Sequence, residues 1–261
     1  MYKMYKMKKF IGLFLLVFLV AGLQNVSAQK ELKEGTITIG ITDLQVDDPS
    51  AAPQLQMIKT ATMNIAFTKD QSLVTGNVMG GMMKMQMLFK TDPKDMLMLI
   101  DAMGQKMMTE LKADDFAEME EKAKEAQTKA KEGDEEFDYD VTYDKKDKKK
   151  ISGYDCYKAN IVVNNKEAKE NNIKIALYVT DAIKYPASMM ESIKSSGAPE
   201  LKLKEMPLEI TISGGEKGKG GSITFAATKI ENIVDKSIFK LNTTGYEKMD
   251  MEDLQKMGGG M

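Results

Sequence analysis

The sequence predicts an α+β fold in which most of the chain forms antiparallel β-strands. Short segments of alternating apolar and polar residues recur after residue 35, and Gly, Pro, Asn and Asp separate them at close intervals. Connections this short join antiparallel neighbours, because parallel strands need a long crossover. Two stretches with helical spacing interrupt the strands. The sequence shows no regular alternation of strand and helix, which disfavours a doubly wound nucleotide-binding fold.

The first expected strand shows the alternation most clearly. In residues 35–41, Ile37, Ile39 and Ile41 fall on one face, which indicates that one side of this strand is buried. Eleven further segments have strand character, of which 137–143 is the weakest. They are residues 56–67, 72–78, 82–90, 95–101, 105–111, 137–143, 155–163, 172–180, 207–213, 221–233 and 237–241.

Two helices are expected between the strands. Residues 113–132 are rich in Ala, Glu and Lys, with Asp114 and Asp115 at the start and Gly133 at the end. Their apolar stripe is narrow and made mostly of alanine, so this helix would rest on a sheet rather than enter a deep core. A shorter helix is expected at 187–194. Acidic and lysine-rich runs in residues 133–150 favour a solvated loop or hairpin tip.

The N-terminal segment is typical of a secretory signal peptide. Residues 1–9 carry four lysines, residues 10–23 are apolar, and small residues end at Ala28. An apolar run of 14 residues is shorter than the roughly 20 that a spanning helix needs, although an uncleaved signal anchor is the alternative. The sequence has no cysteine near the cut that could be lipidated. We therefore expect residues 1–28 to be removed near Ala28 and the product to be periplasmic or secreted, without a transmembrane segment.

Composition excludes several kinds of chemistry. The chain has no His, and all 37 basic residues are lysine, so imidazole relays, His-ligated metals and guanidinium clamps cannot be built. Without the first nine residues the net charge is about −6, which disfavours nucleic acid as a partner. No pair of carboxylates stands out as an acid–base pair, so we expect no catalytic residues, no enzymatic activity and no cofactor. The single Cys156 is either buried or a free reactive thiol.

The glycine-rich stretch at 214–220 has two interpretations. It lacks the Gly-Lys-Ser/Thr ending of a phosphate-binding loop, so it is interpreted as a hairpin turn. Residues 29–246 are expected to form a single domain, and residues 247–261, which end in a glycine run, a flexible tail.

Methionine is the most unusual feature of the sequence. Methionines crowd between residues 57 and 119, and in a strand their spacing places many of them on one face. The candidate ligand-binding set is Met83, Met85, Met87, Phe89, Met96, Met98 and Met107. They could simply fill an irregular core, or they could form an apolar surface that repacks around lipids. A third interpretation is a copper(I) site at Met83, Met85 and Met87, because thioethers are soft ligands, although these residues are about 6–7 Å apart along a strand.

The chain also resembles the periplasmic lipoprotein-carrier superfamily (LolA/LolB-like). The resemblance is carried, in order, by residues 99–101 (LID), 104–108 (GQKMM), 151–159 (ISGYDCYKA), 177–181 (LYVTD), 197–199 (GAP), 206–210 (MPLEI) and 239–246 (FKLNTTGY). It implies that residues 29–246 form an incomplete antiparallel barrel with helices covering its concave face, the helix at 113–132 among them. In carriers that hollow takes acyl chains and presents an arginine, which this chain lacks.

These observations lead to an expected function. We expect an exported binding protein for a lipid or other apolar molecule, with another envelope protein as a further partner. The alternatives are a methionine-rich protein that binds soft metal or scavenges oxidants, and a structural interaction module of the envelope with an exposed apolar patch.

Overall fold

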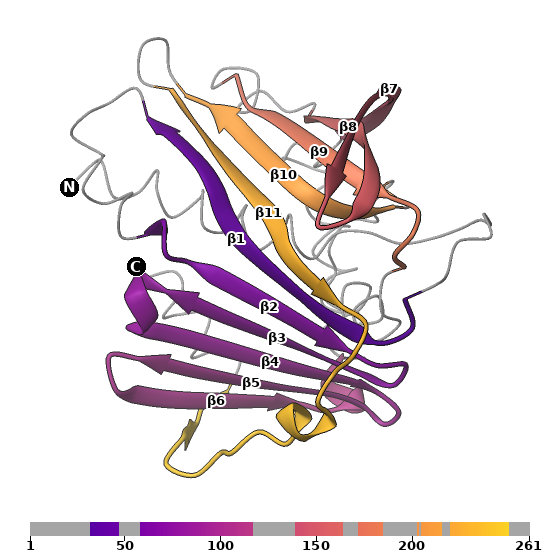
Figure 1. Cartoon of the computed structure of the whole chain (residues 1–261). Coiled ribbons are helices and arrows are strands. Elements are labelled where there is room, and N and C mark those ends of the chain that lie inside the picture. Colours follow the sequence, from indigo (N-terminus) through magenta and orange to yellow (C-terminus); the bar gives the residue numbers. More distant parts are fainter. Residues whose placement is uncertain are drawn as a thin grey trace, which may run out of the picture.

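The computed structural model describes residues 32–46, 58–116, 139–163, 172–184, 203, 205–215 and 220–250. Within these residues twelve β-strands form one open sheet with the strand order β12-β6-β5-β4-β3-β2-β1-β11-β10-β9-β8-β7 (Figure 1). The strands are β1 (Gly35–Val46), β2 (Thr62–Phe67), β3 (Gln71–Val78), β4 (Met83–Thr91), β5 (Lys94–Ala102), β6 (Gln105–Leu111), β7 (Tyr139–Ile151), β8 (Tyr154–Val163), β9 (Lys174–Thr180), β10 (Met206–Gly214), β11 (Gly221–Glu231) and β12 (Glu247–Lys248).

Strand β1 joins two antiparallel meanders. Strands β2 to β6 follow one another on one side of it, and β7 to β11 follow one another on the other side. β1 pairs with β2 along its first half and with β11 along nearly its whole length. The paired antiparallel strands confirm the sequence prediction for this part of the fold, and only β12 runs parallel to its neighbour β6.

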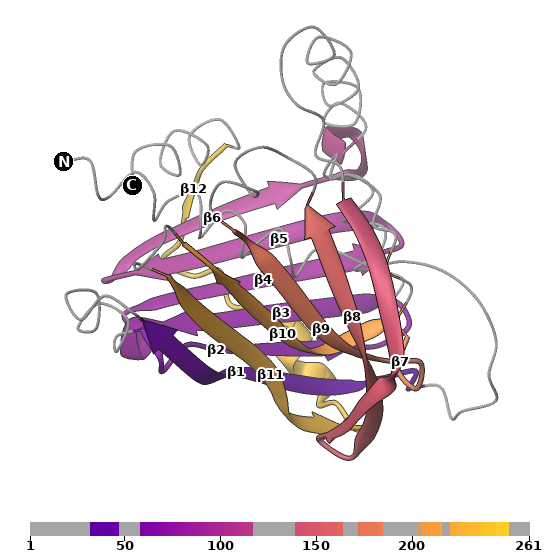
Figure 2. The same cartoon turned by 90° about the horizontal axis from the view of Figure 1, so that it is seen from above.

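The predictions of an α+β fold and of helices that cover the concave face are both wrong. The described part of the chain is one open sheet, and its helical residues form only short turns, including η2 (Met79–Gly81), η3 (Lys236–Phe239) and residues 113–116. The rest of the helix expected at 113–132, and the whole of the one expected at 187–194, lie outside the described residues. The sheet is strongly curved (Figure 2), and its largest apolar cluster continues from the first meander across β1 into the second.

The largest apolar cluster has members in both meanders and in β1 between them. Phe67 of β2 and Phe89 of β4 belong to the same cluster as Cys156 of β8, Leu208 of β10 and Phe225 of β11. A second cluster fills the far half of the sheet around Leu177 and Val179 of β9. Burial of each large side chain of this kind stabilises the fold by about 1.5–3 kcal/mol.

The C-terminal segment covers the opposite face of the first meander. Val234 and Phe239 pack with Leu73 of β3 and Leu88 of β4 in a third cluster, where η3 crosses the sheet. Residues 237–241 were expected to be a strand. Instead, the Asp235 side chain accepts a 2.9 Å hydrogen bond from the Ser237 backbone N–H and starts a 3-10 turn, since this geometry favours a cap over extended pairing.

The lysine run is also placed differently from the prediction. Residues 145–150 do not form a loop or hairpin tip, because they lie inside the long strand β7 at one edge of the sheet. A bulge between Asp144 and Lys148 interrupts the pairing with β8. Charged side chains and bulges are typical of exposed sheet edges, where they hinder pairing with another chain. The mixed charge that suggested a loop is thus explained by the position of this strand.

Two-residue turns end two of the hairpins. Met103 and Gly104 join β5 to β6, and Ser152 and Gly153 join β7 to β8, all four with positive φ. Positive φ at both central residues is typical of the type I′ turn, whose twist matches that of the paired strands. The turn at 214–220 likewise lies between paired strands, since Gly214 of β10 faces Gly221 of β11, and residues 216–219 lie outside the described residues.

The close approach of β1 to β11 gives a test of the fold. A Cβ atom on Gly35 would lie 2.4 Å from the Glu231 carbonyl oxygen, whereas one on Gly76 of β3 would meet nothing within 4 Å. We expect Gly35→Ala to lower the free energy of unfolding by about 1–3 kcal/mol, because a backbone must shift to admit the methyl group. Gly76→Ala should leave it unchanged or raise it slightly. Urea unfolding followed by circular dichroism measures both, and equal effects would contradict the proposed crowding at Gly35.

Candidate functional site

The predicted ligand-binding residues share one face of three neighbouring strands. In β4 the alternate residues are Met83, Met85, Met87 and Phe89. The register places Met98 of β5 directly opposite Met87, and Met96 opposite Phe89. Met107 of β6 lies opposite Ile100 of β5, which is itself opposite Met85. We call this set, with Ile100, the methionine face; its members are Met83, Met85, Met87, Phe89, Met96, Met98, Ile100 and Met107.

One edge of the methionine face merges with the core. Phe89 is buried in the largest apolar cluster, and Met87 and Met96 pack against it. Met83, Met85, Met98 and Met107 are partly buried and lie further from that cluster. Core packing therefore accounts for three of the predicted residues, and the other four extend the apolar surface toward the edge strand β6.

The methionine face carries no charge over its central part. On this side of the three strands, the alternate residues from 83 to 89 in β4, 96 to 102 in β5 and 107 to 111 in β6 are all Met, Phe, Ile, Ala, Thr or Leu. Lys84, Asp101 and Lys106 fall on the opposite side, where Lys84 faces Asp101 and Asp101 faces Lys106. The two sides of these strands thus differ sharply in polarity.

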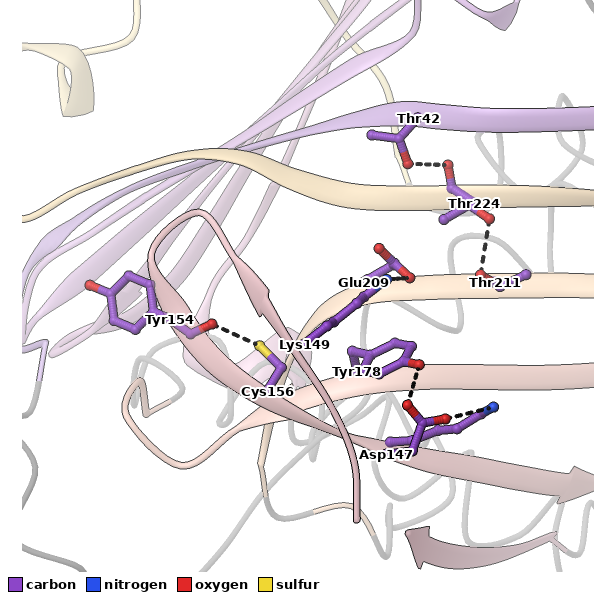
Figure 3. Close-up of polar contacts among 10 residues, drawn as sticks. Thr42, Asp147, Lys149, Tyr154, Cys156, Tyr178, Glu209, Thr211 and Thr224 are labelled. Carbon is purple, nitrogen blue, oxygen red and sulfur yellow. Dashed lines mark hydrogen bonds and ion pairs between the residues drawn. The ribbon is translucent and has the colours of Figure 1, made fainter. Parts of the chain in front are cut away.

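A second group of interacting side chains, which the sequence analysis did not identify, holds the β7–β8 hairpin. The hydroxyl group of Tyr178 on β9 donates a 2.8 Å hydrogen bond to Asp147, which also forms an ion pair of 3.2 Å with Lys158 (Figure 3). Lys149 contacts the Glu209 carboxylate of β10, and its Nζ lies 4.1 Å from the centre of the Tyr178 ring. We call these five residues the hairpin network.

Local structure explains how β7 reaches this position. The Asp144 carboxylate accepts hydrogen bonds from the backbone N–H groups of Lys146 and Asp147, which stabilises the bulge. The strand then bends, and at its end Ser152 Oγ donates a 2.6 Å hydrogen bond to the carbonyl oxygen of Ala227 on β11. An aspartate followed by polar residues is a recognisable signal for such a turn, but the contacts with β9 to β11 depend on the folded sheet.

The electrostatics of the hairpin network favour a structural role. Hydrogen bonding from Tyr178, together with the Lys158 ammonium group, lowers the pKa of Asp147 below its usual value of 3.8. Burial, and then the hydrogen bond to Asp147, raises the pKa of Tyr178 to about 12. The carboxylate is therefore charged and the phenol protonated at neutral pH, and each has a partner of suitable charge.

Cys156 belongs to β8 of the same hairpin and is almost completely buried, with 1% of its surface exposed. Burial raises the pKa of the thiol to about 11, and Sγ lies 3.6 Å from the Tyr154 carbonyl oxygen. The thiol is therefore protonated at neutral pH. Of the two interpretations of Cys156, the structure supports a buried apolar residue over a reactive thiol.

Metal ligands of the common types do not converge in the described residues. Among them, no group of three or more His, Cys, Asp or Glu side chains is arranged to hold an ion. Within the same part of the chain, no helix is long and apolar enough to cross a membrane. The signal peptide expected at residues 1–28 lies outside the described residues.

Comparison of two adjacent lysines tests the hairpin network. Lys149→Met should lower the free energy of unfolding by about 1–2 kcal/mol, because it removes a cation–π contact and leaves Glu209 without its ion pair in a partly exposed site. Lys150→Met removes only an exposed ion pair with Asp155, so it should change the free energy of unfolding by less than about 0.5 kcal/mol. Thermal or urea unfolding of both variants gives the comparison. A loss at Lys150 as large as that at Lys149 would argue against a specific role for the network.

Comparisons with known proteins show only weak similarity. No family model and no curated protein matches the chain. Among solved structures, PNGF-II matches with 12% identity and a TM-score of 0.41 over 86% of this chain, which spans 33% of the PNGF-II chain. A LolA superfamily protein from Nitrosomonas europaea matches with 11% identity and a TM-score of 0.27, over 82% of this chain and 92% of the other. The chain is thus weakly similar in fold to a LolA superfamily protein.

Proposed function

We propose that the protein is an exported binding protein that holds a lipid or another apolar molecule on its methionine face and performs no chemistry. The observation that carries this proposal is the uncharged apolar surface across β4, β5 and β6, built largely from flexible thioethers. Methionine side chains are unbranched and polarizable, so they adapt to ligands of different shape. The signal-like N-terminus supports export.

Partial exposure of this surface supports the proposal further. Met85, Met98 and Met107 are neither buried in a core cluster nor fully exposed. On the opposite side of the same strands, Leu88 and Leu97 are covered by the C-terminal segment with Phe239. An apolar ligand on the methionine face would remove the remaining thioether surface from water, at about 25 cal/mol for each Å² of apolar area.

Polar replacement of two methionines tests ligand binding. In the double variant Met85→Gln and Met98→Gln, the side chains keep their length but place amides against an apolar ligand. We therefore expect the affinity for a fluorescent fatty acid to fall about tenfold or more. A tenfold fall corresponds to a loss of about 1.4 kcal/mol of binding free energy. Native mass spectrometry of protein purified without detergent should also show less copurified lipid.

The control for this experiment uses exposed methionines outside the methionine face. Met82 and Met103 lie at the ends of hairpins and are 49% and 80% exposed. The double variant Met82→Gln and Met103→Gln should keep the affinity of the natural sequence. The proposal fails if the natural sequence binds neither the fatty acid nor copurified lipid, or if the control variant loses as much affinity as the test variant.

A further inference from the structure

The register brings thioethers from different strands together, which the sequence alone could not show. Met87 of β4 and Met98 of β5 are directly opposite one another, and directly opposite residues in an antiparallel pair have Cβ atoms about 4.5–5.5 Å apart. Met85 lies two residues before Met87 on β4, and Met107 lies two residues before Thr109 on β6, so both are diagonal neighbours of Met98. Diagonal neighbours are about 7–8 Å apart, within reach of long side chains.

From this arrangement we infer a binding site for a soft monovalent metal ion, copper(I), centred on Met87 and Met98, with Met85 or Met107 as the third thioether ligand. Soft sulfur ligands select copper(I) over harder ions. Three rotatable bonds let each methionine turn its sulfur toward a shared point. The site does not depend on apolar ligand binding, because it uses sulfur lone pairs rather than the area of the methionine face.

The surroundings of Met98 favour a soft ion over a hard one. Alternation places Asp101 and Glu110 on the other side of these strands, so neither points to the same side as Met98. Thr109, opposite Met98 on β6, donates its hydroxyl to the Met249 carbonyl oxygen at 3.1 Å. Calcium, magnesium and zinc require oxygen, nitrogen or thiolate ligands, and the centre of the methionine face offers thioethers in their place.

The strand register also changes which methionines are expected to bind copper(I). Met83 lies between Val78 of β3 and Ala102 of β5, so it has no thioether directly opposite on either side. The earlier expectation of a site at Met83, Met85 and Met87 along one strand is therefore replaced by one that crosses two or three strands. Met83 becomes a matched control, because it is a partly buried methionine on the same strand and face as Met87.

Anaerobic titration with copper(I), in competition with the chromophoric chelator bicinchoninate, tests this inference. We expect the natural sequence to take up one copper(I) per chain. Met98→Leu and Met87→Leu should each weaken the affinity about tenfold or more, which is the effect of losing about 1.4 kcal/mol of binding free energy. Met83→Leu should leave the affinity unchanged, and circular dichroism checks that all three variants are folded.

Several outcomes would overturn the copper(I) site. They are loss of all copper(I) to the chelator, equal effects of Met83→Leu and Met98→Leu, or X-ray absorption at the copper edge that shows only nitrogen or oxygen neighbours. The leucine variants keep the surface apolar, so they should still bind a fluorescent fatty acid. If the natural sequence binds the fatty acid but loses all copper(I) to the chelator, this inference fails while the proposed function stands.

Discussion

The pairing of β1 with β11 is the constraint on which the rest of the sheet depends. This pairing joins residues far apart in the chain, as in the 3.2 Å hydrogen bond from the Thr228 hydroxyl group to the Thr38 carbonyl oxygen. Without the pairing of β1 with β11, the two meanders would each have an open edge. The register extends from this seam in a continuous row. Successive partners in that row are Ile230, Ile37, Ile65, Val74, Met87, Met98 and Thr109. A shift of β1 by one residue would turn its isoleucines to the opposite face and away from the core.

Local patterns were sufficient to predict most strands. The alternation at Ile37, Ile39 and Ile41 and the turn residue Gly104 identify strands and a hairpin directly, because these signals act within a few residues. Long-range contacts were not predictable in this way. Nothing near Lys149 indicates that it will contact Glu209, which is 60 residues away, so the lysine run at 145–150 was interpreted as a loop or hairpin tip. The expected cover of helices was wrong too, since it rested on the resemblance to the carrier superfamily and not on local signals.

The candidate site was predictable in composition but not in geometry. Alternation alone assigned Met83, Met85 and Met87 to one face, as the register of β4 shows. Which thioethers face each other depends on the neighbouring strand, and the opposition of Met87 and Met98 appears only once β4 and β5 are aligned. Leucine would have given a surface of similar hydrophobicity, so the choice of methionine adds flexibility and a soft donor atom.

The lysines of β7 have a consequence for the behaviour of the protein at high concentration. This strand is an outer edge of the sheet, and Lys145, Lys146 and Lys148 are exposed along it. Their charges repel the same edge of a second molecule and so hinder pairing between the two edges. Acylation of these amines would remove the repulsion that hinders pairing with another chain. Amine-reactive labelling would then promote growth of the sheet from molecule to molecule.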